Sequence, residues 1–220
     1  MALITFLGAS FAVPDSHHGN THFLVKESDS LILVDCAGDG ITRLQQIDVQ
    51  LADITDLIIT HFHPDHDAAG IPLFLMAAWL MGRKIPLTVH GLPHTLDCIK
   101  ANMDLYAWQE WPGLFPVRFV PIENREFAVV TQTPALEVTA SPVRHSIPNV
   151  CLKFKFHRSG KSILYSSDTE PCPEVEHLAS NVDMLLHEAT GPFPGHSSAA
   201  QAAEVARKAL VRALPVPCPL

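Results

Sequence analysis

The chain has 220 residues, 47% of them hydrophobic and 17% charged, which is the composition of a folded globular protein and not of a disordered one. Its formal net charge is −8 and it has no lysine/arginine run, which argues against a broad nucleic-acid-binding surface. The five cysteines are widely spaced and form no Cys-x-x-Cys pair, so we expect a reducing, cytoplasmic setting and no disulfide framework.

The first half of the chain places short apolar runs between longer helical patterns. Runs rich in Val, Ile, Leu and Phe, bounded by Gly, Pro, Asp, Asn or Ser, are typical of strands. Strands are predicted at 2–8, 22–28, 30–36, 56–62, 86–91 and 117–122, and helices at 39–48, 67–82 and 92–108. The most apolar stretch, residues 71–82, is too short to cross a bilayer, so we expect a buried helix there and no membrane association.

The second half begins with strands and ends in helical patterns. Strands are predicted at 127–133, 136–143, 151–157, 162–168 and 183–189, and helices at 172–180 and 197–214. Strands that come in clusters, with helices after some of them, favour two mixed sheets with outer helices, an α/β protein built as an αββα sandwich. Because no linker-like stretch divides the chain, residues 1–220 are predicted to form a single domain.

The segment after the apolar run 57–60 concentrates polar side chains. His61 and His63 are two positions apart and would point the same way on an extended segment, and Asp65 and His66 follow after Pro64. Neutral imidazole and carboxylate are the ligands that zinc and similar divalent metals prefer at an open, catalytic site. Four such ligands at one strand end are enough for a shared two-metal site, so the segment predicts a metal centre.

This segment, THFHPDHDAAG, resembles the HxHxDH signature of the metallo-β-lactamase fold superfamily. Three further segments resemble the motifs of that superfamily in the same order: LILVDCAGD with Asp35, SPVRHSIPN with His145 and ILYSSDTEP with Asp168. The HEAT tetrapeptide that contains Glu188, and the later GHS that contains His196, resemble the ribonuclease Z branch. The resemblance covers nearly the whole chain, and implies the αββα fold.

The resemblance also implies a set of metal ligands. By position, His61, His63 and His145 would hold one ion, Asp65 and His66 the second, and Asp168 would bridge the two. The cofactor would be two divalent metal ions, with zinc as the first choice and manganese or iron as alternatives. Two such ions lower the pKa of a shared water to give a hydroxide nucleophile and neutralise charge on the substrate.

Three residues are candidates for catalysis beyond metal binding. The resemblance implies that Asp65 accepts a proton in addition to binding metal, and that His196 is a proton donor or phosphate contact. Glu188 would orient His196 or another histidine of the site. Taken alone, Asp168 could equally be a helix N-cap, and His196 could be a residue that leads into an N-cap serine.

Two features depart from the ribonuclease Z pattern. Bacterial members hold tRNA with a long arm between the third-histidine motif and the bridging aspartate, whereas here the segment between His145 and Asp168 reads as a plain hairpin. Members also end in a strand whose histidine completes the second metal site, whereas residues 212–220 read RALPVPCPL. Cys218 falls near that position, and the prolines beside it argue against a central strand.

These observations leave three functions open. The leading one is a metal-dependent hydrolase, a ribonuclease Z-like phosphodiesterase that acts on RNA ends or small phosphodiesters. The second is a hydrolase of small carbonyl compounds such as a lactone, a β-lactam or a thioester. The third is a weakly active metal-binding relative that lacks the last ligand. A homodimer is also expected from the resemblance, with the apolar segment 71–81 partly at its interface.

Overall fold

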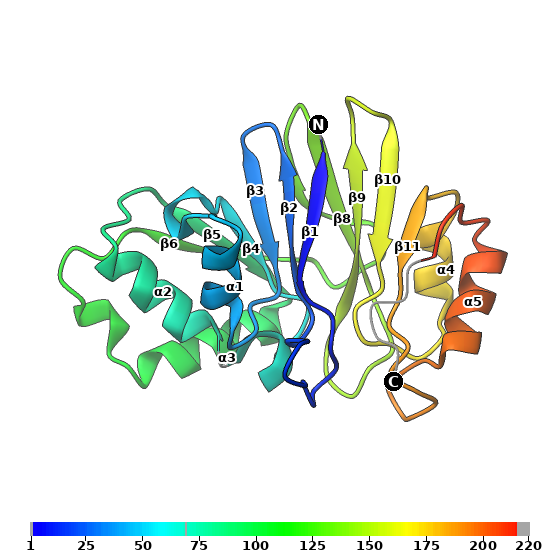
Figure 1. Ribbon diagram of the computed structural model, residues 1–220, viewed down its shortest axis with the longest axis horizontal. Helices are drawn as coiled ribbons and strands as arrows, with labels where there is room; N and C mark the ends of the chain where they lie inside the picture. Colours follow the sequence, from blue (N-terminus) through cyan, green and yellow to red (C-terminus); the bar gives the residue numbers. More distant parts are fainter. Residues whose placement is uncertain (1, 69, 215–220) are drawn as a thin grey trace. The chain divides into compact units, whose positions relative to one another are not determined.

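The computed structural model describes residues 2–68 and 70–214, which form two compact units divided between Pro121 and Ile122. We call residues 2–121 the N-terminal unit and the described residues from 122 onward the C-terminal unit. Each unit is built on one sheet, with helices before or after its strands (Figure 1). The α/β class with two mixed sheets is therefore confirmed.

The N-terminal unit contains a six-stranded sheet in the order β1-β2-β3-β4-β5-β6. Its first three strands are antiparallel and the rest are parallel, because helical segments connect the later strands. The strands are β1 (Leu3–Gly8), β2 (His22–Glu27), β3 (Ser30–Val34), β4 (Asp56–Ile58), β5 (Leu87–Gly91) and β6 (Val117–Pro121). The helices are α1 (Gly40–Gln46), α2 (Gly70–Leu80) and α3 (Pro93–Asp104), with 3-10 turns at Leu51–Asp53 and Trp108–Glu110.

The helix α2 is apolar on both its buried and its exposed sides. Phe74 and Leu75 are fully buried in the core of the N-terminal unit, where burial of side chains of this size is worth about 1.5–3 kcal/mol each. Leu73, Met76 and Leu80 are exposed on the same helix. The prediction of a buried helix is thus right for one side only.

The C-terminal unit contains a five-stranded sheet in the order β11-β10-β9-β8-β7, in which only the β10–β11 pair is parallel. The strands are β7 (Ala128–Gln132), β8 (Leu136–Pro142), β9 (Val150–Phe156), β10 (Lys161–Tyr165) and β11 (Met184–Leu186), and the helices are α4 (Pro173–Ala179) and α5 (Ala199–Lys208). Figure 1 shows α4 and α5 together near β11. The strands β9 and β10 form the hairpin expected between His145 and Asp168.

The last helix is shorter than the sequence predicts. We expected a helix over 197–214, whereas α5 ends at Lys208. Leu210 has a left-handed backbone (φ 56°), and the amide of Val211 donates to the carbonyl of Ala206 at 3.0 Å, which is the Schellman arrangement that closes a helix. The chain then pairs with β11 at Ala213, so tertiary pairing ends a segment whose composition favours continued helix.

The single domain predicted for residues 1–220 stays a prediction. Two sheets that each have their own core can belong to one domain or to two, and the division into units does not decide between them. None of the described helices is long and apolar enough to cross a membrane.

Candidate metal centre

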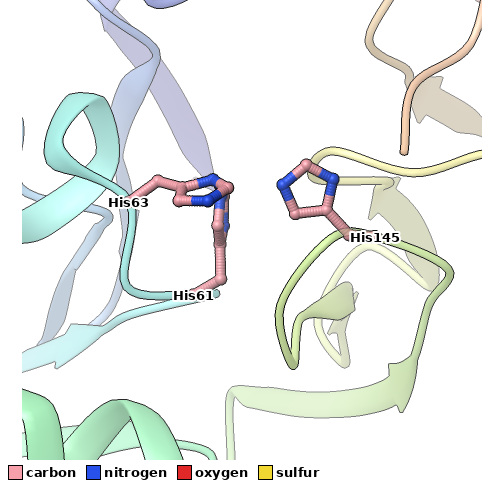
Figure 2. A group of neighbouring side chains, drawn as sticks. All are labelled: His61, His63 and His145. Carbon is pink, nitrogen blue, oxygen red and sulfur yellow. The ribbon is translucent and has the colours of Figure 1, made fainter. Parts of the chain in front are cut away.

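The predicted metal segment begins at the carboxyl end of β4, where a buried parallel strand gives way to a loop. His61 is fully buried and His63 is half-buried, and their rings lie edge to face with centroids 4.8 Å apart. Figure 2 shows both rings on this loop. His61 Nε2 and His63 Nδ1 are 3.1 Å apart. Two nitrogens bound to one tetrahedral zinc at 2.0–2.1 Å would be about 3.3 Å apart, so this spacing suits a shared divalent ion.

Asp35 supports the loop from the end of the neighbouring strand β3. It is fully buried and has a left-handed backbone (φ 57°), which is uncommon for a residue other than glycine. Its Oδ1 accepts hydrogen bonds from the amide and the hydroxyl of Thr60, both at 2.9 Å. Its Oδ2 accepts from His66 Nδ1 at 2.8 Å. One carboxylate therefore fixes both ends of the loop.

These contacts set the tautomers of two histidines. Because the Thr60 hydroxyl donates to Asp35, its oxygen accepts from His61 Nδ1, 3.1 Å away. His66 likewise carries its proton on Nδ1, which donates to Asp35. Both rings then present the lone pair of Nε2, as a neutral histidine ligand requires. The donor chemistry of the loop thus fits a divalent metal.

The loop makes one helical turn before α2 and approaches Cys36 closely. A π-helical turn spans Pro64–Ala68, and within it Asp65 Oδ2 lies 3.8 Å from His66 Nε2. The amide of Cys36 donates to the carbonyl of His66 at 2.6 Å. A Cβ at Gly70 would lie 1.6 Å from the carbonyl oxygen of Cys36, so only glycine fits there. These contacts hold Asp65 and His66 side by side on the loop, although Asp65 belongs to none of the described groups of three or more close donor atoms.

The C-terminal unit places His145 on the loop after β8 (Figure 2). His145 Nδ1 donates to the carbonyl of Gly195 at 2.8 Å, so this ring too presents its Nε2 lone pair. Gly195 has φ 83°, and a Cβ on it would lie 2.9 Å from His145 Nδ1. Glycine is thus required for the contact that orients this histidine.

Asp168 and His196 lie close to His145 within the same unit. One ligand atom from each of the three residues lies within 4.8 Å of the others. Asp168 follows β10, and its carbonyl accepts from Asn149 Nδ2 at 2.7 Å. The alternative of Asp168 as a helix N-cap is wrong, because α4 begins at Pro173 and has Cys172 at its N-cap.

Glu188 connects His196 to the loop that carries Asp168. Its Oε1 accepts from the amide of Thr169 at 2.7 Å, and His196 Nδ1 lies 3.2 Å from the same oxygen. The carboxylate therefore holds the proton on Nδ1 of His196 and fixes the ring. Ser198 caps α5 in a capping box with Gln201, so His196 also leads into an N-cap serine, as the alternative predicted.

Several supporting residues were not predicted from the sequence. Thr60 links Asp35 to His61, and Asn149 holds both the Asp168 carbonyl and the Ser167 hydroxyl. Glu170 accepts from the amide of Gly195 at 2.8 Å. A buried threonine directly before His61 is a signal that could have been noticed, whereas nothing in the sequence pairs Glu170 with Gly195. Cys218, the candidate for the last ligand, lies outside the described residues.

Burial keeps one histidine ring and two cysteine thiols of the C-terminal unit neutral. Burial lowers the pKa of His187, which adjoins Glu188 and whose Nδ1 donates to the carbonyl of Glu188 at 2.8 Å. Burial raises the pKa of the Cys151 and Cys172 thiols. None of these three groups is therefore a charged competitor for metal or substrate at neutral pH.

Comparison with known proteins identifies the family. Ribonuclease Z of Methanothermobacter thermautotrophicus is 27% identical over 270 positions, covering 97% of this chain and 85% of the relative. Ribonuclease Z of Parabacteroides distasonis is 24% identical, covering 96% and 86%. The crystal structure of the short form of human tRNase Z (ELAC1) superposes with a TM-score of 0.81 at 23% identity, covering 98% of this chain and 92% of that chain.

The first match extends over more positions than this chain has residues, so that relative carries insertions. The family model and the structural match together confirm the metallo-β-lactamase fold expected from the sequence, and with the His/Asp set described above they indicate divalent metal binding. The family described as "Beta-lactamase superfamily domain" matches residues 31–215, and the chain belongs to that family.

Proposed function

We propose that the chain is a metal-dependent phosphodiesterase of the ribonuclease Z type, which acts on RNA ends or small phosphodiesters. The observation that carries the proposal is the pair formed by Glu188 and His196 beside Asp168 and His145, since it adds an oriented histidine to a set of metal ligands. The ribonuclease Z relatives, which match over nearly the whole chain, support the substrate class.

The proposed metal ligands are the six residues that the sequence resemblance implies. His61, His63 and His145 would hold one ion, Asp65 and His66 would hold a second, and Asp168 would be a ligand of both. The locked tautomers of His61, His66 and His145 support this assignment, because each presents an unprotonated Nε2. The cofactor is two divalent ions, with zinc favoured by the nitrogen-rich first set and manganese or iron as alternatives.

Bound divalent ions would acidify a water molecule and neutralise charge on the phosphodiester that it attacks. The residues of the chain orient the ligand rings and transfer protons. Glu188 accepts a hydrogen bond from His196 Nδ1 and would stabilise the doubly protonated ring, whose Nε2–H then delivers a proton to the departing oxygen. Asp65, which is partly exposed, accepts a proton from the attacking water. Asp35 and Gly195 keep the ligand rings in place.

Substrate and metal panels test the proposal. The purified chain should hydrolyse bis(p-nitrophenyl) phosphate, lose that activity with a chelator and regain it with zinc or manganese. Turnover of nitrocefin or a lactone panel in place of the phosphodiester would assign it to the hydrolases of small carbonyl compounds. Stoichiometric metal with no turnover of any substrate would assign it to the weakly active metal-binding relatives.

The location and assembly of the protein are part of the same proposal. The buried thiols Cys151 and Cys172 support a cytoplasmic setting, since neither would be expected in a disulfide framework.

We also propose a homodimer that covers the exposed Leu73, Met76 and Leu80 of α2. Sedimentation equilibrium of the chain and of Leu80→Glu should give a dimer and a monomer respectively; a monomeric wild-type chain would exclude the dimer.

A further inference from the structure

The C-terminal unit contains a pocket of about 330 Å³ next to His145, near the lower end of the size range of small-molecule sites. It is lined by Arg144, His145, Ser146, Glu170, Pro194 and Gly195. The pocket therefore contains one metal-ligand candidate, one cation and one anion, and the proposed chemistry gives no role to Arg144 or Ser146.

The backbone of Arg144 is held on both sides. Its amide donates to the hydroxyl of Thr169 at 3.2 Å, and its carbonyl accepts from the amide of Glu170 at 2.8 Å. Residues 144 and 170 form an antiparallel bridge. The exposed side chain of Arg144 thus starts from a fixed position that directly precedes His145.

The carboxylate in the pocket is engaged elsewhere. Glu170 Oε1 accepts from the amide of Gly195, whose carbonyl accepts from His145. Within residues 2–68 and 70–214, no carboxylate forms an ion pair with Arg144. Ion pairs do engage many of the other cations of the unit: Arg125, Lys161, Arg207, Lys208 and Arg212. Arg144 therefore lines the pocket without an ion-pair partner among the described residues.

We propose that Arg144, with the hydroxyl of Ser146, binds a second phosphate of the substrate, the one next to the phosphodiester that is cleaved. The proposal rests on the proposed function and deepens it, since the subsite favours substrates with at least two phosphates, such as a nucleic-acid end, over small diesters. A guanidinium matches phosphate with two parallel hydrogen bonds, which a lone ammonium cannot do. Because the chain has a net charge of −8, a local cation such as Arg144 would offset part of its repulsion of a polyanion.

The neighbourhood of Arg144 and His145 sets which phosphate is bound. Arg144 and His145 both line this pocket, so a phosphate bound by Arg144 would share the pocket with His145. A substrate with a single phosphate, such as bis(p-nitrophenyl) phosphate, has no second phosphate that could bind Arg144. Specificity for nucleic-acid ends over small diesters then resides in one side chain.

Paired substrates test the subsite. For Arg144→Ala, kcat/KM on a five-residue oligoribonucleotide should fall about 10- to 100-fold through KM, as expected for a lost hydrogen bond between charged groups. The same variant should cleave bis(p-nitrophenyl) phosphate at the wild-type rate, and Arg144→Lys should recover part of the loss. Arg158→Ala, an exposed arginine in the β9–β10 turn, is the matched control and should match the wild type on both substrates.

Binding measurements separate this proposal from the proposed function. The affinity of a fluorescently labelled oligoribonucleotide, measured by anisotropy without turnover, should depend on salt. In Arg144→Ala the slope of log K against log [salt] should be smaller by about 0.7, one phosphate contact on a single strand. An unchanged slope, or an equal loss on both substrates, overturns the subsite. A chain that cleaves no phosphodiester but shows the slope change overturns only the proposed function.

Discussion

The two units contribute candidate metal ligands in different ways. In the N-terminal unit four ligands lie within one loop, His61 to His66, and a single carboxylate, Asp35, braces that loop. In the C-terminal unit two candidate ligands, His145 and Asp168, and the catalytic candidate His196 come from three separate loops, each fixed by its own contacts. A contiguous motif can be identified from its own residues, whereas a dispersed one depends on folding to bring its members together.

The largest expected effect comes from removing one ligand in each unit. His61→Ala and Asp168→Ala should each lose metal and reduce phosphodiester turnover by more than the roughly 100-fold that loss of a supporting residue costs. Metal content by elemental analysis and kcat/KM should fall together in both variants. An Asp168→Ala protein that keeps its metal and its rate would show that metal binding does not need Asp168 and depends on the ligands of the N-terminal unit.

The second-largest effect is expected for Asp35, which supports the N-terminal metal loop. Asp35→Ala removes the acceptor of His66 Nδ1 and of Thr60, so metal affinity should fall about 10- to 100-fold. Competition with a chromophoric zinc chelator measures it. Asp48→Ala is the control, since Asp48 has the same left-handed backbone (φ 57°) but is exposed. Equal losses in the two variants would mean that backbone strain, and not the contact, matters.

The glycine that orients His145 gives the corresponding test in the C-terminal unit. Gly195→Ala adds a Cβ 2.9 Å from His145 Nδ1 and should weaken metal binding by about 10-fold, toward the lower end of the range for supporting residues. Gly160→Ala has a similar backbone (φ 67°) with open space around it, so it should cost stability and leave metal affinity unchanged. If both variants bind metal like the wild type, Gly195 does not orient the ligand.

The smallest effect concerns pH and one buried histidine in each unit. Burial lowers the pKa of His22 and of His187 below the ordinary value of 6.5. The unfolded chain then binds more protons, so this part of the stability is complete above pH 6.5 and is lost as the pH falls toward the folded-state pKa. Denaturant unfolding from about pH 7.5 to about pH 5.5 should show a shallower decline for His22→Gln and for His187→Gln.

An exposed histidine provides the control for that series. His157→Gln, in the turn after β9, should leave the pH dependence of stability as it is in the wild type. A wild-type chain whose unfolding free energy is constant over this range would show that neither buried histidine contributes. A shallower decline in only one of the two variants would show that the two units differ in this respect as well.

The strands and the order of the motifs could be predicted from the sequence because both are local signals. The apolar run before Thr60 predicts β4, and the histidines after it identify the loop. The end of α5 could not be predicted, because pairing of Ala213 with β11 overrides the helical composition of residues 209–214. The contact between Glu170 and Gly195 joins residues 25 positions apart and leaves no pattern in the chain.

The hairpin of β9 and β10 has a practical consequence for protein engineering. Its tip, residues 157–160, is exposed and lies between the two segments that carry His145 and Asp168. Longer loops at such positions cost little, because closure entropy grows only slowly with length. A designed recognition module could therefore be inserted there to redirect the chain to a chosen substrate, while the register of the two strands and the chemistry at their ends stay as they are.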